Sequence, residues 1–217
     1  LNGRVRSTWT LPLHKIVISR WLAEEAAALG EDSTYIPNGL DFGAFGVDTA
    51  PESRRDGSIL MLHHTLPWKG TADGLKALAV VGQRQPEALI QLFGTGPEPS
   101  GLPPGFRYHR NPPQDRLRSL YNEAAIFVAP SHAEGWPLPP AEAMMSGCAL
   151  AATDIGGHRE YAVDGETALL SPPGNPEALA ANVLRFAADR DLRCRLARAG
   201  RAYIEQFTWP RAVDALE

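Results

Sequence analysis

The stretch AIFVAPSHAEGWPLPPAEAMMSGCALAAT, residues 125–153, contains a complete strand–loop–helix–strand pattern. Its two apolar runs, at 125–129 and 148–153, are short and bounded by turn residues, which is typical of buried strands. A helix between them can begin only around the prolines that end at Pro140, because proline is tolerated only in the first helical turn, and Gly147 ends it. A strand, a helix and a second strand of this size predict a βαβ unit with parallel strands.

Two glutamates frame these prolines. Glu134 precedes them, and Glu142 follows eight positions later. On one continuous helix the two side chains would point in clearly different directions, because each residue turns the helix by about 100°. The prolines exclude such a helix, so we place Glu134 in a loop and Glu142 in the first turn of the helix. The two carboxylates can then converge on one ligand, although an acid in a first helical turn is equally well explained by the helix dipole alone.

Apolar runs and helical patterns alternate along the rest of the chain. The other expected strands are KIVIS at 15–19, ILML at 59–62 and ALIQLF at 88–93. The other expected helices are RWLAEEAAALG at 20–30, KGTADGLKALAVV at 69–81, RLRSLYNEA at 116–124, and one or two helices within 175–207. This alternation predicts an α/β fold with a doubly wound parallel sheet.

The composition is that of a globular protein. The 217 residues are 44% hydrophobic and 21% charged, and the net charge of −4 argues against a nucleic-acid binder. No apolar run approaches the ~18 residues of a membrane-spanning helix. Cys148 and Cys194 show neither a disulfide nor a zinc spacing, which favours a reducing, cytoplasmic location. The chain begins with Leu1 and shows no signal peptide, so we expect a piece of a longer protein.

In a doubly wound sheet, ligands bind outside the carboxyl ends of the strands. The loops that follow the expected strands lie at 63–69, 94–96, 131–138 and 153–158. The unusual residues of the sequence fall in these loops, which predicts a ligand site at this edge of the sheet.

The first of these loops holds a lysine and two histidines. Lys69 follows HHTLPW near the start of a helix, where a cation is mildly unfavourable unless an anion is shared there. His63 and His64 end the preceding strand, and because neighbouring strand residues point to opposite faces, at most one of them faces a ligand easily. No third metal ligand stands at a helpful spacing, so the sequence predicts no zinc site.

Backbone groups provide two further candidate contacts. Gly94 and Gly96 permit a ligand to approach the backbone closely, although Pro99 breaks the G-x-G-x-x-G pattern of dinucleotide-binding loops. The helix after the prolines lacks a Ser, Thr, Asp or Asn cap, and free N–H groups of residues 141–143 would suit a phosphate. The adjacent prolines remove donors from the same turn, so this anion site is weaker than that of a glycine-rich loop.

Taken together, these motifs resemble the donor-binding half of a family 4 (group 1) glycosyltransferase of the GT-B architecture. The matching segments are VISRWL, YIPNGLDFGAF, KG after a strand, LFGTGP, LYNEAAIFVAPSHAEGWPLPPAEAMMSGCALAATDIGGHREYAVDGETALLSPPGNPEALA and FTWPRAV. The resemblance spans essentially the whole chain, and its centre is the pair Glu134 and Glu142, separated by seven residues. It implies the Rossmann-like, doubly wound sheet of the C-terminal half of such enzymes.

The resemblance implies transfer of a sugar from a nucleotide-diphosphate sugar to an acceptor, with retention at the anomeric carbon and without a metal ion or other cofactor. It places the catalytic Glu134 against the donor sugar and Glu142 on the ribose hydroxyls. Lys69 and the backbone around Leu138 would serve the diphosphate. Further residues implied in donor binding are Gly135, Trp136, His63, His64 and Gly94.

Three positions depart from the family pattern. Pro137 stands where many relatives have a glycine whose N–H faces the donor. His63 and His64 occupy the stretch where relatives often have Gly-Arg, and histidine is only partly charged near pH 7. YHRNPPQ, at 108–114, replaces a more usual glycine turn beside the base pocket. These departures keep open a second hypothesis, a non-catalytic nucleotide-sugar-binding or scaffolding module with the same fold.

The resemblance also divides the chain. Residues 1–38 match the end of an N-terminal acceptor domain and the crossover, and residues 39–217 match the donor-binding domain, whose last helix, near 205–217, returns toward the absent half. The implied partners are a nucleotide-sugar donor and a glycan or lipid-linked acceptor held by the absent half, with no nucleic acid. The resemblance implies a cytoplasmic enzyme of polysaccharide or glycan biosynthesis. It is also compatible with peripheral membrane association of the full-length protein. We expect this chain alone to bind a nucleotide sugar weakly and to transfer nothing.

Overall fold

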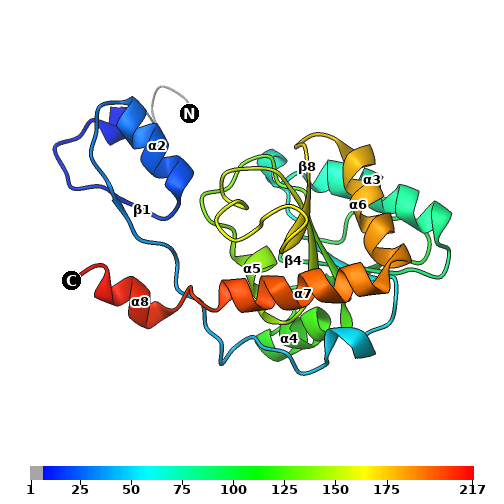
Figure 1. Ribbon diagram of the computed structural model, residues 1–217. Coiled ribbons are helices and arrows are strands. Elements are labelled where there is room, and N and C mark those ends of the chain that lie inside the picture. Colours follow the sequence, from blue (N-terminus) through cyan, green and yellow to red (C-terminus); the bar gives the residue numbers. More distant parts are fainter. Residues whose placement is uncertain (1–6) are drawn as a thin grey trace.

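The computed structural model describes residues 7–217, and its main body is a six-stranded sheet in the order β5-β4-β3-β6-β7-β8 (Figure 1). The strands are β3 (Ser58–Leu62), β4 (Leu89–Gly94), β5 (Arg107–Arg110), β6 (Ile126–Ala129), β7 (Ala149–Thr153) and β8 (Ala168–Ser171). Every neighbouring pair in the sheet runs parallel. The prediction of an α/β fold with a doubly wound parallel sheet is therefore confirmed.

The chain winds in two directions from β3. It first adds β4 and β5 on one side and then crosses to the other side to add β6, β7 and β8. Across the boundary between β3 and β6, Ile59 pairs with Ile126 and Met61 with Val128. In open α/β sheets the crevice at such a change of direction is where ligands bind.

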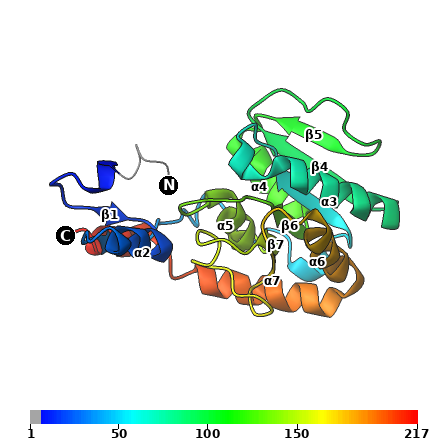
Figure 2. The same cartoon turned by 90° about the horizontal axis from the view of Figure 1, so that it is seen from above.

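Helices cover both faces of the sheet (Figure 2). They are α3 (Thr71–Arg84), α4 (Gln114–Glu123), α5 (Leu138–Met145), α6 (Pro176–Ala188) and α7 (Arg190–Ile204), with two single-turn 3₁₀ helices, η1 (Pro51–Ser53) and η2 (Pro67–Lys69). On one face Leu78 of α3 shares a core with Ile59, and on the other Tyr121 of α4 shares a core with Leu60. Both faces of the central strands are buried, which explains their continuous apolar runs. Within residues 7–217, none of the helices combines the length and apolar character needed to cross a membrane.

A smaller unit, residues 16–35, lies beside the main body (Figure 1, Figure 2). In this N-terminal unit β1 (Ile16–Val17) pairs parallel with β2 (Thr34–Tyr35), and α2 (Arg20–Ala28) lies between them in the chain. The strand expected at 15–19 is therefore shorter than predicted, and Ile16 is 49% exposed rather than buried. The last helix, α8 (Trp209–Asp214), lies next to this unit, and one surface pocket is lined by residues of both.

Glu160 of the main body holds the N-terminal unit. Its buried carboxylate accepts hydrogen bonds from the Tyr35 hydroxyl and from the Arg20 backbone N–H, both at 2.6 Å. The Arg20 guanidinium completes the contact at 3.2 Å. Burial and the adjacent carboxylate raise the pKa of Tyr35, so its hydroxyl stays protonated and remains a donor.

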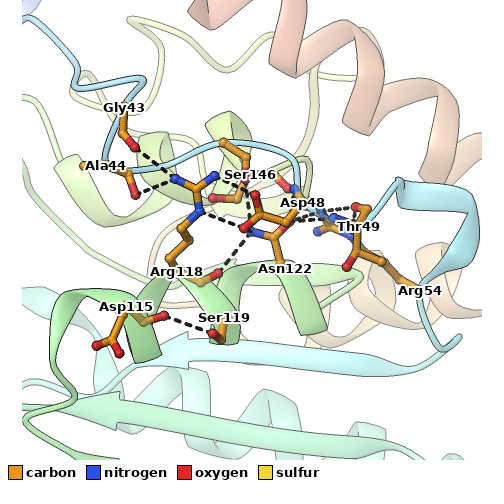
Figure 3. A network of polar contacts seen from close by, with 11 residues as sticks. Gly43, Ala44, Asp48, Thr49, Arg54, Asp115, Arg118, Ser119, Asn122 and Ser146 are labelled. Carbon is orange, nitrogen blue, oxygen red and sulfur yellow. Dashed lines mark hydrogen bonds and ion pairs between the residues drawn. The ribbon is translucent and has the colours of Figure 1, made fainter.

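Arg54 joins the connector before β3 to two helices of the main body (Figure 3). The residue is only 4% exposed. Its guanidinium donates hydrogen bonds to the carbonyl oxygens of Thr49, Tyr121, Ala124 and Ser146. Tyr121 and Ala124 end α4, and Ser146 ends α5, so the cation lies at the negative ends of two helix dipoles. No carboxylate among residues 7–217 forms an ion pair with Arg54, and backbone carbonyls instead satisfy its charge.

Candidate active site

A pocket lies at the carboxyl ends of β3 and β6, where the winding of the sheet changes direction. Its polar lining comes from Lys69, Ser131, Glu134 and His158, and its apolar lining from strand ends and from prolines at the start of α5. The cavity has a volume of about 20 Å³, enough for one water-sized group. Three of the four loops that the sequence predicts to carry a ligand site contribute to this pocket.

Lys69 and Glu134 form an ion pair in this pocket. The lysine Nζ lies 2.8 Å from Oε1 and 3.0 Å from Oε2 of the carboxylate, and the Ser131 hydroxyl donates to Oε1 at 2.8 Å. The two charged side chains are 22% and 11% exposed, so solvent screens their attraction only partly. The structure thus brings together the loop acid and the lysine that the sequence analysis singled out separately.

Two glycines allow these loops to meet. Gly70 has φ +64°, and a Cβ on it would lie 1.9 Å from the Pro130 carbonyl oxygen, so only glycine lets the Lys69 turn close onto the end of β6. A Cβ on Gly157 would lie 2.5 Å from the carbonyl oxygen of Glu134. The loop after β7 therefore packs directly against the backbone of the acidic loop.

Glu142 lies in the second turn of its helix, so its predicted place in the first turn is wrong. The helix α5 starts at Leu138, because Pro139 and Pro140 fit the second and third helical positions and do not delay the start. The Tyr121 hydroxyl donates to Oε2 of Glu142 at 2.9 Å. Burial raises the pKa of Glu142, while the hydrogen bond from Tyr121 opposes this shift.

The start of α5 offers fewer N–H groups than the sequence suggests. In a helix that begins at Leu138, the N–H groups of residues 141–143 bond to the carbonyls four residues earlier and are not free. Pro139 and Pro140 have no N–H. Within the described chain, Leu138 is therefore the one residue of this first turn with an N–H left for an anion.

Trp136 contributes its side chain to the core. Its ring is almost fully buried and packs edge-on against Tyr161 and Phe207, with centroid distances of 4.9 and 5.5 Å. Any contact of this residue with a donor would thus come from its backbone.

The N-terminal unit supports the acidic loop. The Trp21 indole N–H donates to the Gly135 carbonyl at 3.3 Å, and a Cβ on Gly135 would lie 3.3 Å from Ile18. Trp21 also fills the space beside Gly156, where a Cβ would lie 2.3 Å from its ring. Gly135 is thus a packing site for residues 16–35 as well as a candidate contact for a ligand.

The two histidines after β3 each contact another residue of the described chain. His63 lies edge-on to Tyr108 at 5.7 Å, and burial lowers its pKa. His64 accepts the Leu66 N–H at 3.0 Å through Nδ1, assigning the proton of that ring to Nε2 when it is neutral. A Cβ on Gly94 would lie 2.4 Å from the His63 carbonyl oxygen, so this glycine is needed for packing, and its contact with a ligand stays a prediction. Among residues 7–217, no group of three His, Cys, Asp or Glu side chains is placed to hold a metal ion.

His158 is a residue of the pocket that the sequence analysis did not single out. Its side chain is fully buried, its Nδ1 lies 2.7 Å from the Thr153 carbonyl oxygen, and burial lowers its pKa to about 4. Its Nε2 is buried without a hydrogen-bond partner among the described residues. The sequence does contain a pattern that points to His158, because this histidine ends one of the loops at the carboxyl edge of the sheet and follows two glycines.

The buried His158 predicts a pH dependence of stability. The unfolded chain binds a proton at this histidine below about pH 6.5, whereas the folded chain binds it only near pH 4. Protonation of this histidine therefore favours the unfolded chain below about pH 6.5, and the folded chain loses stability as the pH falls from 6.5 toward 4. We expect the free energy of unfolding to fall by roughly 1–2 kcal/mol between pH 6.5 and pH 5 because of this group.

Urea unfolding of the wild type and of His158→Asn across this pH range measures the effect. The difference between the two proteins isolates His158, because burial also lowers the pKa of His63 and of His109. Equal slopes for both proteins would contradict the prediction.

Comparison with known proteins identifies the family. The sequence model described as "Glycosyl transferases group 1" matches residues 50–203. Phosphatidyl-myo-inositol mannosyltransferase of Mycobacterium tuberculosis is 29% identical in an alignment of 222 positions that covers 91% of this chain and 58% of the relative. D-inositol 3-phosphate glycosyltransferase of Streptomyces bingchenggensis is 32% identical over 144 residues, 59% of this chain and 32% of the relative. The chain therefore spans 58% of the length of the first relative and 32% of the length of the second.

Solved structures show the same fold. The C-terminal domain of a glycosyl transferase group 1 family protein (LpcC) from Francisella tularensis matches with a TM-score of 0.67 and 23% identity, covering 77% of this chain and 97% of that chain. The HepE protein of Anabaena in complex with UDP-glucose matches with a TM-score of 0.76 and 19% identity, covering 92% of this chain and 60% of that chain. The chain belongs to the glycosyl transferases group 1 family, and its fold is that of the C-terminal domain of a GT-B glycosyltransferase.

Proposed function

We propose that this chain is the donor-binding half of a retaining glycosyltransferase, which transfers a sugar from a nucleotide-diphosphate sugar to an acceptor without a metal ion. The observation that carries the proposal is the Lys69–Glu134 ion pair in a pocket at the change of winding direction. A cation and a carboxylate at this point of an α/β sheet fit the two ends of a glycosyl diphosphate.

Each charge has a task in the transfer reaction. The leaving group departs as a diphosphate, and Lys69 with the Leu138 N–H would stabilise the negative charge on its oxygens. The sugar becomes oxocarbenium-like as the bond breaks, and Glu134 is the carboxylate that would stabilise it. A phosphate oxygen can then take the proton of the acceptor hydroxyl, so no protein base is required.

Glu142 would hold the ribose of the nucleotide. Tyr121 occupies its Oε2, and among the described residues no hydrogen-bond partner occupies Oε1. That oxygen can accept hydrogen bonds from the vicinal hydroxyls of a ribose, a common task for a carboxylate beside a nucleotide. The backbones of Gly135 and Trp136, and the neighbourhood of His63, His64 and Gly94, would complete the donor site.

The acceptor would bind outside this chain. The relative from M. tuberculosis is named for a phosphatidyl-myo-inositol acceptor, and the chain covers 58% of its length. We propose that a glycan or lipid-linked acceptor binds to a further domain, that the N-terminal unit and α8 lie toward that domain, and that residues 1–217 alone bind the donor and transfer nothing.

Two observations favour a second candidate function. The first turn of α5 offers a diphosphate a single N–H, and Glu134 already balances the charge of Lys69. Both features weaken diphosphate binding, as would suit a nucleotide-sugar-binding or scaffolding module without chemistry.

Calorimetry with UDP, GDP, dTDP and ADP tests the proposal. We expect one nucleotide to bind selectively, and Glu142→Ala to weaken its binding about tenfold or more, because a hydrogen bond to a charged group contributes roughly 1.5–3 kcal/mol. Glu142→Gln checks that the effect is not a loss of the Tyr121 contact, since its amide oxygen can still accept from that hydroxyl. Glu123→Ala, at an exposed position of α4, is the matched control. Failure of every nucleotide to bind would contradict the proposal, and binding without transfer by the full-length protein would favour the scaffold.

A further inference from the structure

The tautomer of His158 is fixed by its neighbours. The Thr153 hydroxyl donates its single proton to the Ser131 carbonyl, so it has none to give to the histidine ring. The Thr153 carbonyl, 2.7 Å from Nδ1, can only accept, so Nδ1 carries the ring proton. The ring is neutral because burial lowers its pKa to about 4. The Nε2 atom therefore presents a lone pair.

This lone pair lacks a donor in the protein. Nε2 is buried, and no hydrogen bond reaches it from the residues that the structure describes. Leaving a buried polar atom unpaired costs about 1–3 kcal/mol, so such atoms call for an explanation. His158 lines the same pocket as Lys69 and Glu134, and the Lys69 ammonium is directed to both oxygens of Glu134.

The chemistry of the lone pair selects one part of a glycosyl diphosphate. Phosphate oxygens are acceptors and would be repelled by Nε2, whereas sugar hydroxyls donate hydrogen bonds. The cavity has room for a group about the size of one water molecule, so a single hydroxyl group fits in it. Gly157, which precedes His158, packs on the backbone of Glu134, the residue proposed to face the sugar.

We propose that Nε2 of His158 accepts a hydrogen bond from one hydroxyl group of the donor sugar and so helps to determine which sugar is bound. This inference rests on the proposed function and goes beyond it, because it assigns a residue to the recognition of the sugar rather than of the nucleotide. A donor whose sugar has no hydroxyl at that position leaves the buried atom unpaired, and we expect it to bind more weakly by about the contribution of one hydrogen bond.

The test compares a nucleotide with its sugar conjugate. Calorimetry measures the affinity of the 217-residue chain for UDP and UDP-glucose, and for GDP and GDP-mannose, in the wild type and three variants. His158→Asn can keep a donor for the Thr153 carbonyl but has no acceptor at the Nε2 position. His158→Gln can place an amide oxygen there. His132→Asn changes a histidine that pairs with Asp73 near the surface and is the matched control.

We expect His158→Asn to weaken binding of the sugar nucleotide about fivefold to tenfold, in line with one lost hydrogen bond, and to leave binding of the nucleotide diphosphate unchanged. His158→Gln should recover part of the loss, and His132→Asn should have no effect. Deoxy-sugar conjugates then identify the hydroxyl: the conjugate that lacks it should bind the wild type and His158→Asn equally well.

Two results overturn the inference alone. One is an equal loss of affinity for nucleotide and sugar nucleotide, which indicates a purely structural histidine. The other is unchanged affinity for both, which indicates that a buried water satisfies Nε2. If circular dichroism shows that His158→Asn does not fold, the deoxy conjugates are measured on the wild type and on His158→Gln. The inference is then overturned if every deoxy conjugate binds both proteins as tightly as the parent sugar nucleotide does. Failure of the wild type to bind any of these four ligands, and dTDP and ADP as well, defeats the proposed function itself.

Discussion

Replacing Arg54 with methionine is expected to lower the free energy of unfolding by about 4 kcal/mol, a large part of the roughly 5–15 kcal/mol that stabilises a typical domain. Methionine keeps much of the aliphatic packing and removes the hydrogen-bond donors. The carbonyls at the ends of α4 and α5 would then be buried without partners, each at a cost of about 1–3 kcal/mol before relaxation. For a chain of this size the midpoint of thermal unfolding should fall by roughly 10 °C.

The adjacent arginine provides the control. Arg55 is exposed and donates only to the Glu87 carbonyl, so Arg55→Met should change stability by no more than about 0.5 kcal/mol. Urea and thermal unfolding of both variants measure the difference. Similar losses for the two variants would show that Arg54 stabilises the protein by packing or general charge and not by closing the two helix ends.

Replacing Lys69 with methionine is expected to weaken binding of the nucleotide diphosphate about 100-fold. Removing one charge of a desolvated pair costs about 2–5 kcal/mol, and here the remaining charge, Glu134, would face the phosphates and repel them. Glu134→Gln should not weaken diphosphate binding and should, if anything, make it tighter. The Lys69 ammonium then has no carboxylate partner in the protein, so its full charge can attract the phosphates. Sugar transfer by the full-length protein should be lost in Glu134→Gln all the same, because the oxocarbenium-like sugar has no carboxylate.

Calorimetry at one fixed ionic strength checks this pair of opposite effects, because salt screens such charges. Lys76→Met is the control, since Lys76 lies on α3 with 69% of its side chain exposed and should not alter binding. Equal weakening by Lys69→Met and Glu134→Gln would mean that the lysine only positions the carboxylate and does not meet the diphosphate.

The central strands could be predicted from the sequence, and the edge strands could not. β3, β4, β6 and β7 are buried on both faces and therefore appear as apolar runs. β5 has the sequence RYHR, with no buried residue, because it lies at the edge of the sheet. β8 is short and follows a turn at the opposite edge, so its four residues carry too little periodicity to predict. Both omissions leave the site unchanged, because the pocket lies at the centre of the sheet.

The site was predictable to the level of its loops. Rules for the carboxyl ends of parallel strands placed Lys69 and Glu134 at one edge, and the strand order brings their loops side by side. Their ion pair depends on Gly70 closing onto the Pro130 carbonyl, a contact that no local pattern reveals. The burial of Trp136 and the unpaired nitrogen of His158 depend likewise on packing between distant segments. The position of Glu142 in its helix was missed because prolines were taken to delay the helix, whereas they occupy its first turn.

The interlocking of Trp21 and Ile18 with the glycines of the acidic loop has a mechanical consequence. These side chains occupy the space that Gly135 and Gly156 leave open, so residues 16–35 cannot swing away without dragging the Glu134 loop or opening a void. If the proposed donor binds against the Glu134 loop, its binding and any tilt of that segment would be thermodynamically linked, and each would bias the other by the same free energy.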